Sequence, residues 1–420
     1  MRIIRSTKCS TKYMTAQKRQ QLHSVLQEYG KVVNVFIDHF WVNGKVPKSK
    51  LLKDIVGIPK DSTWFTARLR KVAAREALDM VTSVQEVFQS NKDRIASNVH
   101  DIESKIKEIQ SRPDSRRNRA KIDRLSCKRK RLMMKHDMML PHKPRHAGKR
   151  MCVSCTIGNL QESKKSTEFD RWLHLSSVGN GIVIDIPINL HKHFKNLEQV
   201  GQRLNSYVVT KDYVQFPFEI ETGPKKEVNY CLGIDTGINA LASTSTGEQF
   251  GTDIKECIER VKRCTWGSRG HQKASNALRQ RISEVAKEVV GKADLVVVEN
   301  LKNLCNNTKL KRRLSQNIRR SIGSWNYRYW LNRIEQQCEW NRVSFRTVSP
   351  AYTSQRCSSC GHVDRGNRKG EMFLCQFCGH TGNADVNAAF NILMRFLTGK
   401  YGSRYKPENL KVGDVQLCLG

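Results

Sequence analysis

The stretch Tyr230-Cys231-Leu232-Gly233-Ile234-Asp235-Thr236-Gly237 decides the fold of the second half of the chain. Its mostly apolar run is typical of a strand that is buried on both faces, and a carboxylate follows the run at once. The run Leu295-Val296-Val297-Val298 has the same form and ends in Glu299. An amphipathic helical pattern precedes the second run, with apolar residues at Ala274, Leu278, Ile282, Ala286 and Val289. Alternating strands and helices predict an α/β domain.

A third acid follows near the other end of this half. Residues 383–396 have helical periodicity, and Asp385 shares one stripe with Ala388, Ala389 and Ile392, so it is expected to face the sheet. A single acid after a strand is usually an ordinary loop residue. Three carboxylates at one sheet edge repel one another unless they share divalent cations. The sequence therefore predicts a site for two Mg²⁺ or Mn²⁺ ions, held by Asp235, Glu299 and Asp385. Such a site is typical of phosphodiester hydrolysis, in which one ion activates water and the other stabilises the leaving oxygen.

Two cysteine pairs predict a second kind of metal site. Cys357 and Cys360 precede Gly361, and Cys375 and Cys378 precede Gly379, with fourteen residues between the two pairs. Such knuckles place four thiolates at the corners of a tetrahedron, as in a closed structural zinc site that leaves no position for water. A weaker set is His142, His146, Cys152 and Cys155. It lies in a segment rich in proline and lysine, so a linker is the favoured interpretation and a second zinc the alternative.

The charge of the chain predicts a polyanionic partner. There are 74 Lys and Arg residues against 39 Asp and Glu in 420 residues, a formal charge of +35. Residues 1–150 hold 35 basic and 14 acidic residues, which is +21 of that total. Nucleic acid is the expected partner, because neutralising phosphates releases counterions. No apolar run is long enough to span a bilayer and the first residues lack the apolar run of a signal peptide, so we expect a soluble intracellular protein without membrane contact.

The basic residues lie on expected helices of the first third. The patterns predict a short strand at 2–8, helices at 15–40 and from Ser62 to 88, and an antiparallel helical hairpin over 92–136 in which Ile95, Val99, Ile102, Ile106 and Ile109 form the seam. The hairpin contains the candidate nucleic-acid contacts Arg116, Arg117, Lys128, Arg129 and Arg131. A basic loop after Glu299 adds Lys311, Arg312 and Arg313, for which a solvated loop is the alternative. Residues 167–220 alternate with period two and predict a β-rich module that pairs with the first strand.

Several of these motifs also resemble those of a known family. Four segments stand in the same order and spacing as in TnpB. They are Gly233-Ile234-Asp235-Thr236-Gly237, Val297-Val298-Glu299-Asn300-Leu301, the segment 349–361 with the first cysteine pair, and the segment 375–389 with the second pair and Asp385. TnpB is the RNA-guided nuclease of insertion sequences, and the miniature type V CRISPR effectors are its relatives.

The resemblance implies an RNase H-like, RuvC-type nuclease domain with an inserted zinc ribbon, a β-barrel wedge module and a basic α-helical recognition lobe. In this interpretation Asp235, Glu299 and Asp385 hold the catalytic ions, and Cys357, Cys360, Cys375 and Cys378 hold one structural zinc. The resemblance further implies a bound guide RNA, double-stranded target DNA opened beside a short flanking motif, and cleavage of both strands at one site. We expect a cytoplasmic, nucleoid-associated protein that is encoded by a prokaryote or a mobile element. Two choices stay open: transposon TnpB or CRISPR effector, and monomer or homodimer.

The expected boundaries follow from these patterns: wedge strand at 1–10, recognition lobe at 11–140, wedge module at 141–225, nuclease at 226–350 and 382–397, zinc ribbon at 351–381, and a tail at 398–420.

Two alternative functions remain on this fold. One is a guide-dependent DNA-binding repressor that does not cut in practice, which the intact acidic residues disfavour. The other is an unguided transposase or resolvase, which the large basic lobe disfavours.

Overall fold

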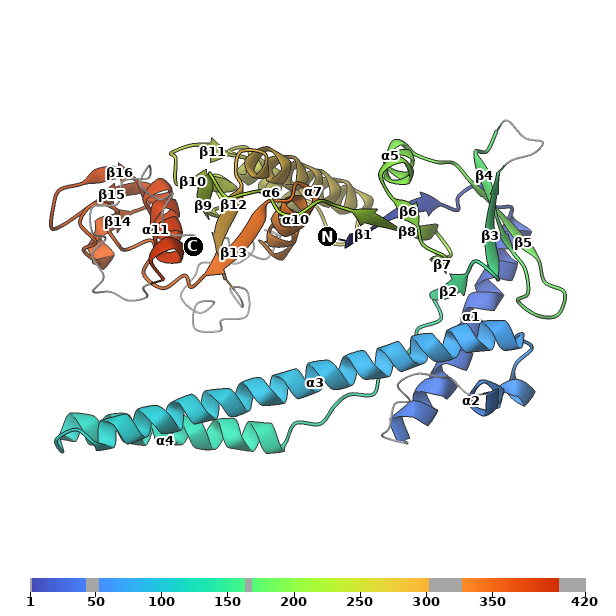
Figure 1. Cartoon of the computed structure of the whole chain (residues 1–420), viewed down its shortest axis with the longest axis horizontal. Helices are drawn as coiled ribbons and strands as arrows, with labels where there is room; N and C mark the ends of the chain where they lie inside the picture. Colours follow the sequence, from blue (N-terminus) through green and yellow to red (C-terminus); the bar gives the residue numbers. More distant parts are fainter. Residues whose placement is uncertain (1, 43–52, 163–167, 302–326, 400–420) are drawn as a thin grey trace. The chain divides into compact units, whose positions relative to one another are not determined.

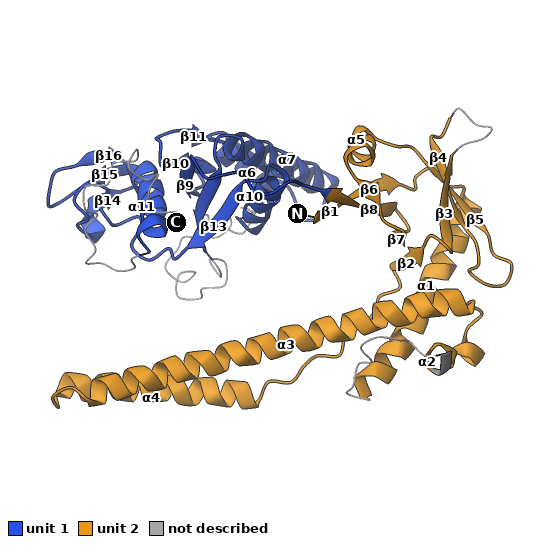
Figure 2. Cartoon of the chain, viewed as in Figure 1, with its two compact units in different colours: residues 1, 221–420 blue, residues 2–220 orange. Residues whose placement is uncertain are grey.

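The computed structural model describes residues 2–42, 53–162, 168–301 and 327–399. The chain divides into two compact units, residues 2–220 and residues 221–420, which Figure 2 colours orange and blue. Within the described residues, no helix is long and apolar enough to cross a membrane. The predicted tail at 398–420 falls almost wholly outside the described residues.

Two β-sheets form part of unit 2–220. The larger has the order β1-β8-β7-β2, with β6 paired to β8, and the smaller has the order β3-β4-β5. The strands are β1 (Arg2–Ser10), β2 (Arg150–Ser154), β3 (Gly158–Glu162), β4 (Arg171–Leu175), β5 (Ile184–Ile188), β6 (Gln202–Arg203), β7 (Ser206–Thr210) and β8 (Tyr213–Glu221). The strict alternation of β8 buries Phe216 and Phe218, against which Phe194 of α5 (Lys192–Val200) packs edge-on.

The predicted β-rich module is confirmed in its main features. The first strand joins the sheet of β7 and β8, and β4 and β5 form the expected hairpin, with Leu173 opposite Ile186. The interpretation of 142–155 as a linker is wrong for its second half, because β2 pairs with β7 along its whole length and buries Met151 and Val153. Closure of the two sheets into a barrel stays a prediction.

The helices of this unit differ from the prediction in one respect. Besides α5, the α-helices described in this unit are α1 (Ala16–Val42), α2 (Lys53–Gly57), α3 (Ala67–Gln110) and α4 (Arg116–Asp137). The two helices expected from Ser62 to 88 and from 92 onward form one continuous helix, α3, of 44 residues. Thr66, not Ser62, is its N-cap, since the Thr66 hydroxyl accepts a hydrogen bond from the Leu69 amide at 3.3 Å.

The predicted hairpin is confirmed. Figure 1 shows α4 alongside the distal half of α3. Ile95, Ile102 and Ile109 recur every seven residues and are 4 to 6% exposed. They form the narrow apolar seam that joins the two helices.

Unit 221–420 is built on a five-stranded sheet of order β11-β10-β9-β12-β13. Its elements are β9 (Cys231–Asp235), β10 (Ala242–Thr244), β11 (Gln249–Phe250), α6 (Ile254–Arg263), α7 (Arg269–Val290), β12 (Leu295–Glu299), α10 (Tyr327–Trp340), β13 (Ser344–Val348) and α11 (Ala384–Thr398). β9, β12 and β13 are parallel, whereas β10 is antiparallel to β9 and to β11. The predicted α/β domain is therefore present.

Helices cover both faces of this sheet. Val296 and Val298 of β12 pack with α6, α7 and α10, and the intervening Leu295 and Val297 pack with α11. Two-sided burial explains why β12 is an uninterrupted apolar run rather than an alternating one. Trp330 and Ile334 of α10 are fully buried in this core.

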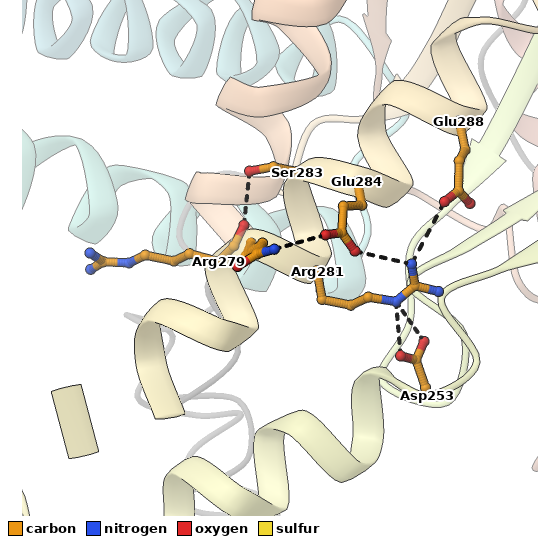
Figure 3. A network of polar contacts seen from close by, with 7 residues as sticks. Asp253, Arg279, Arg281, Ser283, Glu284 and Glu288 are labelled. Carbon is orange, nitrogen blue, oxygen red and sulfur yellow. Dashed lines mark hydrogen bonds and ion pairs between the residues drawn. The ribbon is translucent and has the colours of Figure 1, made fainter. Parts of the chain in front are cut away.

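An ion-pair network fixes α7 against the start of α6 (Figure 3). The Arg281 Nε atom donates hydrogen bonds to both carboxylate oxygens of Asp253, at 3.0 and 2.8 Å. The same guanidinium lies 3.5 Å from Glu284 and 3.7 Å from Glu288. Hydrogen bonding to Arg281 lowers the pKa of Asp253 below its ordinary value.

Gly233 sets the distance between β9 and α11. A Cβ atom at this position would lie 2.3 Å from the Ala389 carbonyl oxygen and 2.7 Å from the Leu393 Cβ atom. The backbone of the strand and that of the helix therefore touch at a point where only glycine fits.

We expect Gly233→Ala to lower the stability of the protein, because the added methyl group forces α11 away from the sheet. Overpacking of this kind costs about 1–3 kcal/mol of unfolding free energy, which thermal or urea unfolding measures. Gly382→Ala is the matched control, since a Cβ atom there meets nothing within 4 Å. Equal stability of the two variants would contradict a tight contact at Gly233.

Candidate active site

The sheet brings two of the predicted acids to one edge. β9 and β12 are adjacent and parallel, with Leu295 opposite Cys231 and Val298 opposite Ile234. Asp235 is the last residue of β9 and Glu299 is the last residue of β12. The carboxyl ends of parallel strands meet at the same edge, so these two side chains lie together there.

The third acid reaches this edge from α11. Asn383 caps the helix by accepting hydrogen bonds from the Asp385 and Val386 amides, at 2.9 and 3.1 Å. Asp385 thus lies in the first turn and is only 8% exposed. Because α11 packs on β9 at Gly233, its first turn is held at the end of the strand that bears Asp235.

The three carboxylates interact electrostatically. Burial raises the pKa of Asp235 to about 7, with further contributions from the charges of Glu299 and Asp385. Burial also raises the pKa of Glu299, although a hydrogen bond from Thr353 opposes the shift. A buried group of acids that destabilise one another in the charged form is the donor set that a hard divalent cation fits.

Two residues that the sequence analysis did not single out contact these acids. Arg368 of β14 (Arg368–Lys369) donates a hydrogen bond to Asp385 at 2.6 Å. The Thr353 hydroxyl donates a hydrogen bond to Glu299 and is 2% exposed. The only local signal for Arg368 is its place in the basic stretch 365–369 between the two cysteine pairs.

Among the described residues, the structure gathers the four cysteines, but not the three acids, into a group of candidate metal ligands. Among the described residues, Cys357, Cys360, Cys375 and Cys378 are the one group whose ligand atoms all lie within 4.8 Å of one another. The guanidinium of Arg368, which occupies one oxygen of Asp385, neutralises part of the negative charge that would otherwise be shared with cations.

The four cysteines form a site that could hold a zinc ion. Cys357 Sγ lies 3.7 Å from Cys378 Sγ, and Cys360 Sγ lies 3.6 Å from Cys375 Sγ. The two knuckles share one backbone geometry: the amides of Gly361 and Gly379 donate to the carbonyls of Cys357 and Cys375, at 3.0 and 3.1 Å. Both glycines have φ above +70°, a conformation in which a side chain is strained. Four converging thiols without an open position match a structural zinc site.

The ribbon that bears these cysteines is fastened to α11. The ribbon strands are β14, β15 (Met372–Leu374) and β16 (Thr381–Asn383), which form one sheet. Asn387 of α11 accepts a hydrogen bond from the Ser358 amide at 2.9 Å, and its amide group donates to the Arg356 carbonyl at 2.8 Å. The helix that positions Asp385 therefore depends on a folded first knuckle.

The weaker set of His142, His146, Cys152 and Cys155 does not gather into a metal site among the described residues. His146 is buried and its Nε2 atom lies 3.5 Å from Glu76. Burial would raise the pKa of Glu76, but the nearby His146 and a hydrogen bond from the Tyr29 hydroxyl at 2.9 Å outweigh it and lower the value to about 2. His146 thus faces the buried carboxylate of Glu76, and Cys155 is exposed.

The candidate nucleic-acid contacts divide into two groups. Arg116, Arg117, Lys128, Arg129 and Arg131 are all exposed on α4. Arg129 pairs with Glu103 of α3 at 3.3 Å. Lys311, Arg312 and Arg313 lie outside the described residues.

Known proteins resemble parts of this chain. Residues 327–392 match the family model described as Cas12f1-like, TNB domain. The chain is 43% identical over 74 residues to the CRISPR-associated endodeoxyribonuclease Cas12f1 of Sulfoacidibacillus thermotolerans, which covers 17% of this chain and 18% of that protein. It is 35% identical over 116 residues to the TnpB-like protein aq_aa05 of Aquifex aeolicus, covering 27% and 37% of the two chains. It is 27% identical over 236 residues to the putative RNA-guided DNA endonuclease InsQ of Escherichia coli K12, covering 48% and 58%.

These matches each span less than two thirds of the relative's length. Among solved structures, the CasPhi-2 (Cas12j) complex with crRNA and phosphorothioate DNA aligns over 95% of this chain and 92% of that chain, with a TM-score of 0.49 and 11% identity. The resemblance to TnpB and to the miniature type V effectors that the motifs indicate is confirmed by the relatives of those names.

The raised pKa of Asp235 makes a prediction for the metal-free protein. Because its folded pKa is about 7 against an ordinary 3.8, ionised Asp235 destabilises the fold increasingly as the pH rises from about 4 to 7, and fully above that. We expect Asp235→Asn to raise the melting temperature at pH 8 and to leave it nearly unchanged at pH 4. The gain is at most about 4 kcal/mol, since one pKa unit corresponds to about 1.4 kcal/mol. A lower melting temperature of the variant at pH 8 would exclude this repulsion, and added Mg²⁺ should stabilise wild type but not the variant.

The cysteine geometry predicts one zinc ion per chain. Elemental analysis should find about one equivalent in wild type and in Cys127→Ser, whose thiol is exposed on α4, and almost none in Cys360→Ser. Loss of zinc should also release the first turn of α11, which a lower melting temperature reports. Full zinc content in Cys360→Ser would refute the site, and loss of a second equivalent in Cys152→Ser would restore the weaker set as a ligand group.

Proposed function

We propose that this protein is an RNA-guided DNA endonuclease that hydrolyses phosphodiester bonds at a RuvC-type site. The observation that carries the proposal is the meeting of Asp235, Glu299 and Asp385 at the carboxyl ends of two parallel strands, from β9, β12 and α11. The motif resemblance and relatives named as endonucleases support the same activity. Of the two alternative functions, neither has a structural observation that favours it.

Asp235, Glu299 and Asp385 would hold two Mg²⁺ or Mn²⁺ ions. When bound, these ions would supply an activated water and charge stabilisation for the leaving 3′ oxygen. The acids must be ionised for this role, and the raised pKa of Asp235 implies that cation binding and proton release are linked. Activity should therefore rise with pH toward neutrality.

Contacts around the acids orient them for that task. The hydrogen bond from Thr353 fixes the carboxylate of Glu299 at the end of β12. Arg368 holds Asp385 by one oxygen and brings a positive charge to the edge where a phosphodiester would lie. A guanidinium in this position suits a phosphate as well as a carboxylate, because both accept paired hydrogen bonds.

The zinc ribbon supplies the rigidity of this arrangement. It contributes Arg368 directly, and through Ser358 and Asn387 it is bonded to the helix of Asp385. We therefore assign a structural role to the zinc and a chemical role to the divalent cations at the sheet edge. The closed tetrahedral set leaves the zinc no position for substrate.

A guide RNA and a double-stranded DNA target are the proposed partners. A formal charge of +35 is far more than a cluster of three acids needs to attract a substrate. In such a complex, base pairing with the guide reads the sequence while the protein recognises duplex shape and a short flanking motif. The relative InsQ carries the name of a putative RNA-guided DNA endonuclease.

The test is guided cleavage by the protein expressed beside its native locus. We expect one discrete RNA to copurify and cleavage to follow its guide segment when that segment is exchanged. Asp235→Ala, Glu299→Ala and Asp385→Ala should each lower the cleavage rate by a factor on the order of 1,000 or more, since each removes a ligand of the cations, while target binding stays nearly normal. Lys369→Ala, next to Arg368 but outside the acidic group, is the control.

Each alternative function predicts a different outcome. Cleavage that ignores the guide exchange would favour the unguided transposase or resolvase. Tight guided binding with no cleavage by wild type in Mg²⁺ or Mn²⁺ would favour the repressor.

A further inference from the structure

The positive charge of the hairpin belongs to one helix rather than to both. Over residues 92–110, the distal half of α3 has four Lys or Arg residues and four Asp or Glu residues, so it is neutral. Over residues 116–137, α4 has ten Lys or Arg residues and only two acids. No residue of α4 is buried. The hairpin therefore presents one strongly basic helix supported by a neutral one.

Six of the ten basic residues of α4 lie on one line. The intervals between them are four, three, four, three and four residues, which keeps them on one face of a helix with 3.6 residues per turn. They span about 27 Å at 1.5 Å per residue. We call this set the α4 stripe: Arg117, Lys121, Arg124, Lys128, Arg131 and Lys135.

The structure leaves this stripe electrostatically uncompensated. All six side chains are exposed, and none of them forms an ion pair within the described part of the chain. Two acids of the hairpin instead pair with basic residues outside the stripe: Asp114 lies 3.4 Å from Arg119, and Glu103 lies 3.3 Å from Arg129. Neighbouring cations without counter-charges repel one another, so the stripe is favourable only with a polyanion against it.

The hairpin fixes the direction in which the stripe faces. Ile122 and Leu125 of α4 are partly buried and lie on a different face of the helix from the stripe. The pairing of Arg129 with Glu103 anchors the side of α4 next to α3. Ser115 caps the helix by accepting a hydrogen bond from the Asn118 amide at 3.1 Å. The six cations therefore form a straight row whose spacing does not depend on the ligand.

The composition of α4 indicates what kind of polyanion fits. Proteins that bind single strands stack bases on aromatic side chains, and α4 contains no Phe, Tyr or Trp. A row of cations alone recognises phosphates that are already regularly spaced, as in a double helix. Lys and Arg in about equal number also argue against a site for one particular anion.

We propose that the α4 stripe binds the phosphate backbone of a double-helical nucleic acid without reading its bases. The inference deepens the proposed function, on which it rests for the presence of nucleic acid, and it places the contact on one face of one helix. Of the residues predicted from sequence, it retains Arg117, Lys128 and Arg131 and excludes Arg116 and Arg129. It adds Lys121, Arg124 and Lys135.

The test compares two triple variants of equal charge in the full chain. The first, Arg124→Gln, Lys128→Gln and Arg131→Gln, removes half of the stripe. The matched control, Arg116→Gln, Arg119→Gln and Lys130→Gln, removes three exposed charges from other faces of the same helix. Binding of a 20-base-pair RNA duplex, a DNA duplex of the same sequence and a single-stranded RNA is measured by fluorescence anisotropy over a series of salt concentrations. Circular dichroism confirms that helix content is unchanged.

The stripe variant should bind the duplexes on the order of 100-fold more weakly at 0.1 M salt, and the slope of log K against log salt should fall in magnitude by about 2–3, since each phosphate contact contributes about 0.9. The control should change the slope by less than about 1. Comparison of the RNA and DNA duplexes identifies which double helix the stripe prefers. Equal losses in the two variants, or a loss as large for the single strand, would overturn the proposal.

This result is independent of cleavage. A protein whose cleavage follows an exchanged guide, but whose two triple variants bind duplexes equally, would keep the proposed function and lose the α4 stripe. If the stripe variant binds duplexes more weakly but cleavage ignores the exchanged guide, the α4 stripe is supported and the proposed function is lost.

Discussion

The candidate site depends on one contact, the direct packing of α11 on β9 at Gly233. A strand and a helix approach so closely only where a side chain is missing, and the Ala389 carbonyl and Leu393 occupy the space that a Cβ atom would need. This contact brings Asp235 and Asp385 close together in space, although 150 positions separate them in the sequence. The parallel pairing of β9 with β12 then adds Glu299. Packing energy from the apolar faces of the sheet thereby offsets the repulsion among three carboxylates that are wholly or partly buried.

The zinc ribbon is part of the same construction. It is inserted between β13 and α11, so its fold determines where the last helix begins. Hydrogen bonds from Asn387 and Asn391 to the carbonyls of Arg356 and Thr353 tie the helix to the segment that leads into the first knuckle. That segment also contains Thr353, which bonds Glu299. One short stretch of chain thus links the cysteines, the helix and two of the three acids.

Each unit concentrates charges of one sign, negative in unit 221–420 and positive in unit 2–220. In unit 221–420, like negative charges are concentrated at a sheet edge and partly balanced by Arg368. In unit 2–220, like positive charges are concentrated along α4, and the nearby acids Asp114 and Glu103 are paired with residues outside the stripe. Both arrangements are costly in the free protein, and each becomes favourable with a ligand of opposite charge: cations at the acids and phosphates along the helix.

Most strands and helices and all the motifs of the candidate site could be predicted from the amino-acid sequence. Two-sided burial of β9 and β12, the heptad seam of the hairpin, the spacing of the four cysteines and the acids at strand ends are local patterns, which the order of residues records directly. Only the tertiary structure decided that α3 is one helix, that 150–154 is a strand, and that Arg368 and Thr353 bond the acids. It also decided which basic residues of α4 lack a counter-charge. These features depend on contacts between residues far apart in the chain, such as the 54 positions that separate Thr353 from Glu299, and no local periodicity encodes them.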